Sequence, residues 1–237
     1  MKKTFWSGLA SSFLTAVGLT IASSGFSTAN AASMTFHAYP FLGDSSEVKI
    51  TLDDEIAGAG KVQFKVDVVP NPFIGDIRGV FFNILNNSLL KDVVIIGSDI
   101  TEVVKRPGDV AATSNGSSIM YEGRFDIGVQ IGTPNRVQDD IQSTVFTLSH
   151  PNVALDIAQF TTETDPVTNQ GPKALLFGVD LRSIGTVNGP RSGLSKLGAG
   201  VDDKVTVPEP ATAVALGLVA IVGFGLHKQK KKQQAET

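Results

Sequence analysis

The chain of 237 residues contains no cysteine. This absence excludes disulfide bonds, thiolate metal sites and cysteine nucleophiles. Many small secreted domains rely on disulfides, so a domain of this chain in an oxidising compartment would have to be stabilised by burial of its core instead.

Aromatic side chains and histidines are also scarce. Trp6 is the one tryptophan, Tyr39 and Tyr121 are the two tyrosines, and three histidines occur. Glycan-binding proteins typically use exposed aromatic platforms, so this scarcity weakens a carbohydrate-binding interpretation without excluding it. His37 and His150 have no partner motif, and the sequence has no G-x-S-x-G elbow. We therefore predict no enzyme activity, no catalytic residue, no metal and no cofactor.

The first 31 residues have the pattern of a secretory signal peptide. Lys2 and Lys3 precede an apolar stretch from Phe5 to Phe26, and Ala29 and Ala31 supply the small residues of a cleavage site. This order of a basic start, an apolar segment and small residues predicts export through the Sec translocon and removal by signal peptidase after Ala31.

The C-terminal end has three parts in a fixed order. Pro208, Glu209 and Pro210 follow a short stretch, from residue 201, that is expected to be a terminal strand or a tether. Two prolines with one residue between them fix φ and remove two backbone donors, so this motif is expected to be extended and accessible. The uncharged run from Ala211 to Leu226 would span about 24 Å as a helix, less than the hydrocarbon core of about 30 Å. We predict a weak transmembrane helix over residues 211–227, helped by bilayer thinning and snorkelling lysines.

A basic tail closes the chain over residues 228–237. Its lysines directly follow the apolar run and are Lys228, Lys230, Lys231 and Lys232. Basic clusters beside a membrane span are held on the cytoplasmic side. The body of the protein is therefore expected on the opposite side of the membrane.

This ending resembles the PEP-CTERM sorting signal of exosortase substrates, which are surface proteins of cyanobacteria and other Gram-negative bacteria. The resemblance covers about the last 30 residues, and the lysine-rich tail departs from the arginine-rich form common in the family. It implies that Pro208, Glu209 and Pro210 are recognised by a membrane-embedded, cysteine-dependent exosortase that removes the tail during export. It also implies an association with the cell envelope or with exopolysaccharide. The alternative is a plain C-terminal membrane anchor after a proline-rich linker.

The charge of the exported part differs from that of the whole chain, which is −3. Removal of the six terminal lysines and Glu236 leaves 14 basic and 22 acidic residues, a formal charge of −8. Such a body is expected to avoid nucleic acid and anionic lipid.

Residues 32–200 read as an all-β domain. Val62, Phe64, Val66 and Val68 alternate with polar residues, as in a half-buried strand. The expected strands are 48–52, 62–68, 77–85, 89–96, 100–104, 118–121, 125–131, 143–148 and 174–181. Residues 185–200 are interpreted as a glycine-rich loop. Short strands with Gly, Pro, Asn and Asp turns predict an antiparallel two-sheet β-sandwich of the jelly-roll or immunoglobulin/cohesin-like kind, and residues 62–85 weakly resemble the early strands of cohesins.

Acidic pairs and triplets fall at expected loop positions, where they could gather calcium. They are Asp53-Asp54-Glu55, Asp139-Asp140 and Asp202-Asp203. None has the spaced pattern of a dedicated calcium loop, and aspartate favours turns, so we interpret them as turn-forming acids. The stretch from Gly58 to Lys61 lacks the other residues of a phosphate loop and is also read as a turn.

The sequence thus favours an exported, exosortase-processed surface or extracellular-matrix protein without catalytic activity, held transiently at the inner membrane by its C-terminal helix. The alternative is an adhesin or lectin-like module, with calcium as an option. A secreted hydrolase ranks last, because no nucleophile and base occur together.

Overall fold

The alternation of buried and polar residues determines the strands of this protein. The computed structural model describes residues 33–70, 72–119, 124–133, 139–161 and 175–206, which fall within one compact unit. In β3 (Lys61–Val69) every second side chain is buried, and β2 (Glu47–Asp53) follows the same pattern. The two strands pair in antiparallel register from Glu47 opposite Val69 to Asp53 opposite Gln63. The period-two prediction for this region is confirmed.

The remaining elements are mostly strands, as predicted. They are β1 (Ser33–Gly43), β4 (Phe73–Phe82), β5 (Val94–Ile96), β6 (Ile100–Val110), β7 (Phe125–Ile131), β8 (Ser143–Ser149), β9 (Phe177–Thr186), β10 (Arg191–Ala199) and β11 (Lys204–Thr206). Short helical turns are η1 (Asn87–Leu89), α1 (Ala158–Thr161) and η2 (Val201–Asp203). All strand pairs that the structure describes are antiparallel, so the all-β antiparallel class is confirmed.

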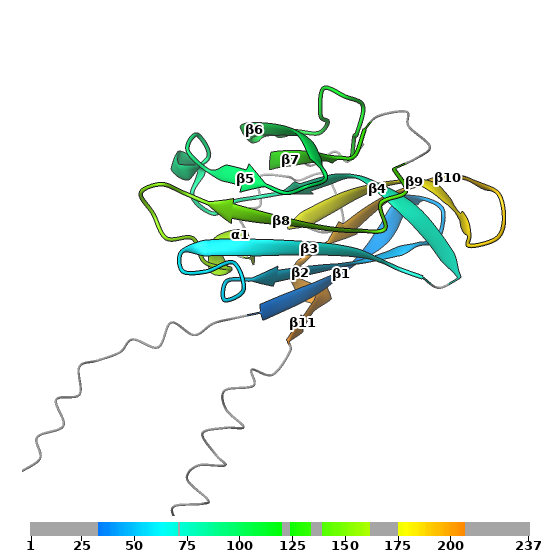
Figure 1. Ribbon diagram of the computed structural model, residues 1–237, viewed down its shortest axis with the longest axis horizontal. Coiled ribbons are helices and arrows are strands. Elements are labelled where there is room, and N and C mark those ends of the chain that lie inside the picture. Colours follow the sequence, from blue (N-terminus) through cyan, green and yellow to red (C-terminus); the bar gives the residue numbers. More distant parts are fainter. Residues whose placement is uncertain (1–32, 71, 120–123, 134–138, 162–174, 207–237) are drawn as a thin grey trace, which may run out of the picture. The chain divides into compact units, whose positions relative to one another are not determined.

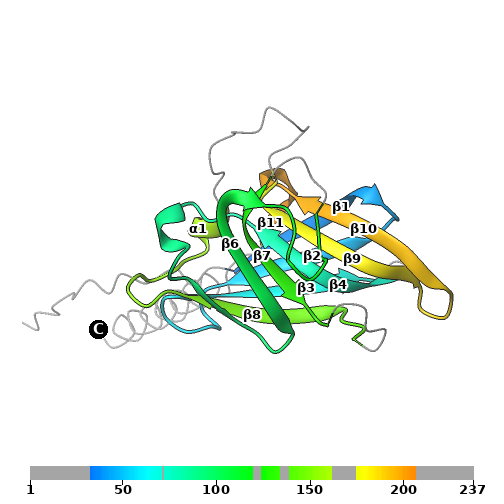
Figure 2. The same cartoon turned by 90° about the horizontal axis from the view of Figure 1, so that it is seen from above.

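The eleven strands form one continuous sheet (Figure 1). Its order is β5-β8-β3-β2-β1-β10-β9-β4-β7-β6, and β11 pairs with β1 beside this path. The turn of the β9–β10 hairpin projects at one side of the domain (Figures 1 and 2).

The prediction of two separate sheets needs correction, because β1 belongs to both halves. Residues 33–38 of β1 pair with β2, whereas Tyr39 to Gly43 pair with β10. The register shifts between Pro40 and Leu42, where the strand passes from one half to the other. Proline has no N–H for a sheet hydrogen bond, which suits this irregular position. The two halves therefore pack face to face but remain joined through one strand.

The opposite ends of the sheet, β5 and β6, also lie close together. They are consecutive in the chain, and Lys105 of β6 donates hydrogen bonds from Nζ to the carbonyls of Lys91 (3.1 Å) and Val93 (2.8 Å), just before β5. Thr144 of β8 donates to the Asp99 carboxylate between the two strands (2.9 Å). The sheet is thus nearly closed on itself.

Phenylalanine rings fill the space between the two halves. The ring centroid of Phe64 lies 4.8 Å from that of Phe82, 5.2 Å from Phe146 and 5.4 Å from Phe160. These side chains are buried in one apolar cluster with residues of both halves. Aromatic pairs at such distances stabilise a core by more than the burial of their apolar area alone. A chain without cysteine is therefore stabilised by an aromatic core, as expected for the described domain.

Several segments differ from the prediction: β1 has no predicted counterpart, and the bounds of β4, β6 and β9 differ from the expected strands 77–85, 100–104 and 174–181. Residues 185–200 are not a loop: β9 runs to Thr186, and β10 returns from Arg191 to Ala199. Residues 89–96 contribute only the three-residue β5 after η1. In the predicted strand 118–121, Ser118 forms an isolated bridge with Ala112, and residues 120–123 lie outside the described part.

Candidate functional site

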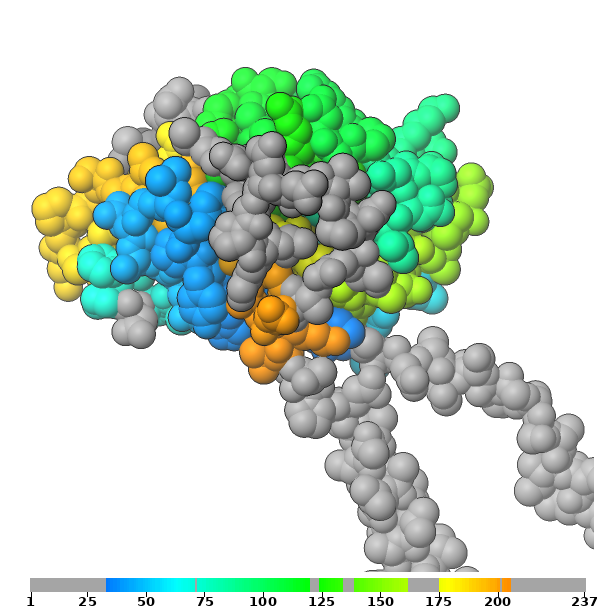
Figure 3. Space-filling view, turned by 180° about the vertical axis from the view of Figure 1, so that it is seen from behind, coloured from blue at the N-terminus to red at the C-terminus, as the bar shows by residue number. Residues whose placement is uncertain are grey.

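The two ends of the described domain lie on neighbouring strands. β11 pairs antiparallel with the start of β1, with Met34 opposite Thr206 and Phe36 opposite Lys204. Figure 1 shows β11 beside the beginning of β1, and Figure 3 shows the same strands, orange and blue, at the surface. Both predicted sorting segments therefore attach at one pole of the domain, which we call the terminal pole.

A short turn positions β11 at this pole. The Asp203 carboxylate accepts a hydrogen bond from the Gly200 backbone N–H (2.8 Å), and the Asp203 N–H donates to the Gly200 carbonyl (3.2 Å). These two bonds close a short turn after which β11 continues along β1 in the same direction as β10. Asp203 of the acidic pair Asp202-Asp203 therefore forms a turn, as predicted.

The predicted processing residues lie outside the described part of the chain. They are Ala29 and Ala31 of the cleavage site, Pro208, Glu209 and Pro210 of the motif, and Lys228, Lys230, Lys231 and Lys232 of the tail. The predicted membrane helix at residues 211–227 also lies there. Within the described ranges, no helix has the length and apolar character needed to cross a membrane.

A row of polar residues crosses the outer face of the half formed by β10, β9, β4, β7 and β6. Neighbouring strands place its polar members side by side, with Gly79 between the second and the third: Lys196, Asp180, Gln130 and Glu102. The segment 113–118 covers this row and donates hydrogen bonds to it. The row is therefore an internal support for the covering segment.

Asp180 is the best-supported member of the row. It is fully buried, and its Oδ2 accepts hydrogen bonds from the Ser117 hydroxyl and the Ser118 N–H, both 3.1 Å. Its Oδ1 contacts Lys196 Nζ and lies 3.4 Å from Arg182 Nε. Ser117 is itself buried, and its hydroxyl is held by Asp180.

Lys196 is only 2 % exposed, so its charge depends on Asp180. Burial lowers the pKa of Lys196, and the charge of Asp180 and its hydrogen bond oppose that effect. In a buried ion pair of this kind each charge is compensated by the other. Removal of either residue leaves an uncompensated buried charge, which destabilises the fold. The pair thus joins β9 to β10 inside the row.

A second cluster of charges joins β4 to the loop before β8. Arg78 Nη2 lies 2.5 Å from Asp76 Oδ2, and Arg191 Nη2 donates to Asp140 Oδ1 (2.6 Å). Burial raises the pKa of Asp76 to about 6, although the Ile141 N–H and the Arg78 charge act in the opposite direction. The hydrogen bonds from Arg191 lower the pKa of Asp140. Asp140, a residue of one of the acidic pairs weighed as calcium ligands, is therefore bound to the Arg191 guanidinium.

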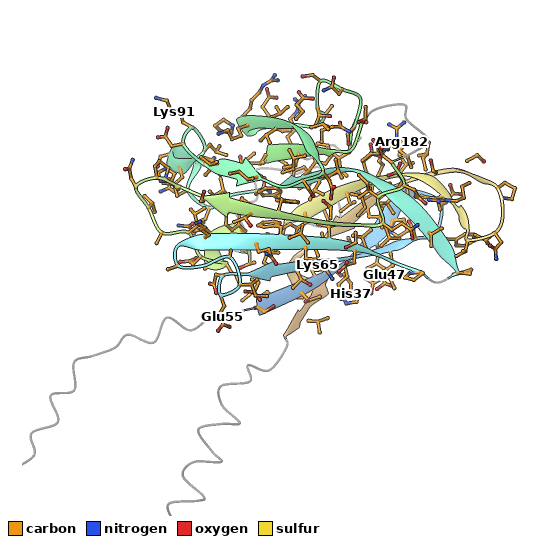
Figure 4. The ribbon with its side chains drawn as sticks, viewed as in Figure 1. His37, Glu47, Glu55, Lys65, Lys91 and Arg182 are labelled. Atoms are coloured by element: carbon orange, nitrogen blue, oxygen red, sulfur yellow. The ribbon has the colours of Figure 1, made fainter. Side chains whose placement is uncertain are left out.

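The two candidate histidines have ordinary partners. His37 on β1 contacts the Glu47 carboxylate, and Figure 4 shows these side chains together. The ring of His150, after β8, accepts a hydrogen bond from the Asn152 N–H (3.2 Å). Neither histidine lies in a group of three or more potential ligands that could hold a metal, and no such group occurs in the part of the chain that the structure describes.

Turn-forming roles are also observed for the first acidic cluster and for the glycine stretch beside it. Asp53 Oδ1 accepts from the N–H groups of Glu55 (2.9 Å) and Ile56 (2.8 Å). Gly58 and Gly60 adopt positive φ, which L-residues with side chains rarely do. The interpretation of residues 53–61 as a turn is confirmed.

Comparisons with known proteins give no relative: no family model matches the chain, and no match occurs among the curated proteins or the solved structures. Functional arguments therefore depend on the sequence at both ends and on the geometry of the domain.

The sequence pattern does not reveal the buried charges. Lys196 falls within the expected loop at residues 185–200, and Asp180 falls within an expected apolar strand. A charged residue within the apolar run of residues 175–181 was the available signal, because a buried carboxylate requires donors from elsewhere in the chain.

Proposed function

We propose that this chain is an exported surface or extracellular-matrix protein that an exosortase processes, with a β domain that has no catalytic activity of its own. The single observation that carries the proposal is the ordered C-terminal sequence of the Pro208-Glu209-Pro210 motif, apolar run and lysine tail. The signal-peptide pattern at the other end supplies the export that such processing requires.

The domain geometry is compatible with this route. Because β1 and β11 are neighbours, the segments that precede residue 33 and follow residue 206 leave from the same pole. A domain connected in this way can fold beyond the membrane while its C-terminal helix, residues 211–227, holds it transiently at the inner membrane. Cell envelope and exopolysaccharide are the proposed destinations after cleavage.

The deciding experiment is the intact mass of the protein recovered from the surface or medium of its native host. We expect a polypeptide that begins after Ala31 and ends near Pro208 to Pro210, with any added mass reporting a glycan or an anchor. Recovery in the membrane with the basic tail attached would identify a plain anchor and overturn the proposal.

A matched pair of variants tests the motif itself. Glu209→Gln changes the charge between the two prolines, and Glu236→Gln makes the same change beyond the basic cluster. We expect the first to leave the tail attached and the second to be processed normally. Equal processing of both would mean that Glu209 is not read.

A second candidate, a glycan-binding adhesin, is favoured by one exposed aromatic residue. Tyr39 is 51 % exposed on β1, and its ring lies 6.5 Å from that of His37, which contacts Glu47. An aromatic face beside polar groups is a feature of glycan sites. Binding on a glycan array that is lost in Tyr39→Ala would support this candidate. Silence on the array, together with thermal melting that EGTA leaves unchanged, would reject it.

A further inference from the structure

β11 is held to the domain by few interactions. It has three residues, paired with Met34, Thr35 and Phe36 of β1. The side chain at its centre, Val205, is 49 % exposed, so β11 buries little apolar surface there. Chain ends with few buried contacts are the parts that open at low free energy while the core stays folded.

The strand to which β11 is attached does not depend on it. Residues 33–38 of β1 pair on their other edge with β2, and Phe36 and Ala38 are buried in the main core. Separation of β11 would therefore expose one short edge of β1 without disturbing the register of the sheet.

The sorting motif begins very close to this strand. Only Val207 separates the last paired residue, Thr206, from Pro208. Four residues reach at most about 14 Å even when fully extended, so the motif cannot move far from the terminal pole while β11 is paired. An enzyme that cuts beside Pro208 must also hold residues on the N-terminal side of the bond. The backbone groups of those residues, 204–206, are already engaged with β1.

We propose that β11 is a releasable strand, and that an exosortase can process the chain only after β11 separates from β1. This inference rests on the proposed function and concerns the regulation of the same site. The turn at Gly200 and Asp203 is where the released segment would pivot, since it is the last hydrogen-bonded feature before β11. Cleavage would then follow the population of the open state, as for other substrates cut through local opening.

A disulfide across the pair tests the proposal directly. Thr35 and Val205 lie directly opposite each other, and opposite residues of antiparallel strands are near enough for a disulfide after a small adjustment. Because the chain has no cysteine, Thr35→Cys combined with Val205→Cys introduces the only thiols. The full chain would be made in its native host, and the loss of the C-terminal segment followed by intact mass, with and without a membrane-permeant thiol reductant.

We expect the oxidised double variant to be processed at least about tenfold more slowly than wild type, because the open state is removed. Adding the reductant to the double variant should restore processing. Each single variant, which cannot form the disulfide, should be processed at the wild-type rate. If wild type and the oxidised double variant are processed at the same rate, the releasable-strand proposal is wrong and the proposed function stands. If wild type itself keeps its tail, both proposals fail.

A loosening variant gives an independent test that does not depend on a disulfide. Val205→Gly weakens a three-residue strand at the terminal pole, and Val94→Gly makes the same change in β5, which also has three residues and where Val94 is 45 % exposed. Glycine in place of valine destabilises a strand, and we expect it to raise the population of the open state about fivefold. We expect faster processing for Val205→Gly and an unchanged rate for Val94→Gly. Unchanged or slower processing of Val205→Gly would contradict the proposal.

Discussion

At the scale of single residues, Asp180 is bound by donors from three parts of the chain. Removal of its carboxylate in Asp180→Ala would leave Lys196 buried without a counter-charge. Loss of one partner of a buried pair typically costs about 3–5 kcal/mol, and we expect a loss of that size in the free energy of unfolding in urea.

The matched control is Asp109→Ala, which removes an ion pair to Arg124 in which both side chains are more than half exposed. Exposed pairs contribute about 1 kcal/mol or less. An equal loss of stability in the two variants would show that Asp180 does not support a buried charge.

Asp76 gives the domain a dependence on pH. Its pKa in the folded state is about 6, above the ordinary value of 3.8, so the folded state binds this proton more tightly than the unfolded chain does. The stabilising contribution of the proton is therefore full below 3.8 and is lost as the pH rises through about 6. At about 1.4 kcal/mol per pKa unit, the loss amounts to about 3 kcal/mol.

Asp76→Asn tests this dependence, since asparagine stands in for the protonated acid at every pH. We expect the variant to gain up to about 3 kcal/mol over wild type in the free energy of unfolding between about pH 4 and about pH 7. A difference between the two proteins that stays constant over this range would contradict the argument.

At the scale of elements, the absence of a side chain at Gly79 lets the segment 113–118 lie against β4. A Cβ at this position would be 2.0 Å from Ser117 Oγ and 2.9 Å from Ser117 Cβ. We expect Gly79→Ala to displace the covering segment and to cost about 1–3 kcal/mol, the usual range for overpacking.

A double-mutant cycle with Ser117→Gly identifies the cause. In the Ser117→Gly background both clashing atoms are absent, so Gly79→Ala should cost less there than in wild type, as measured by urea unfolding followed by circular dichroism. The same cost in both backgrounds would mean that the alanine acts through some other contact.

The strands that the sequence predicts well are those with one buried face. β2, β3 and β8 lie within one residue of their predicted bounds, because alternation gives a half-buried strand a simple pattern. β7 also matches its predicted bounds, although its residues are buried on both faces. β10 lacks this signal: Lys196 and Gly198 face the covering residues and are buried, so polar and small residues occupy both sides. The sequence of β1 also carries the alternation, in Met34, Phe36 and Ala38.

The terminal pole was predictable only in part. A short terminal strand in residues 201–207 was one of two expectations, and β11 agrees with it. Its partner could not be inferred, since the pairing joins residues about 170 positions apart and depends on the closure of the whole sheet.

At the scale of the whole molecule, topology in the membrane is expected to depend on the tail. Replacement of Lys228, Lys230, Lys231 and Lys232 by glutamine removes the charge, and replacement by arginine keeps it. Each basic residue near an anionic surface contributes about 1 kcal/mol, so we expect the glutamine variant to lose cytoplasmic retention of its C-terminus and the arginine variant to keep it. Protease accessibility of the C-terminus in cells whose outer membrane has been opened measures this, and identical accessibility would contradict a topological role.

The antiparallel pairing of β1 and β11 also determines how the domain responds to force. Sheet hydrogen bonds run perpendicular to the strands. A load that pulls the two chain ends apart at the terminal pole acts along the β1–β11 hydrogen bonds and breaks them one after another. A load applied between this pole and the projecting β9–β10 hairpin acts along the strands and strains many bonds together. Under a load on the two chain ends, the β1–β11 pair would therefore separate at low force, while the rest of the sheet stays folded.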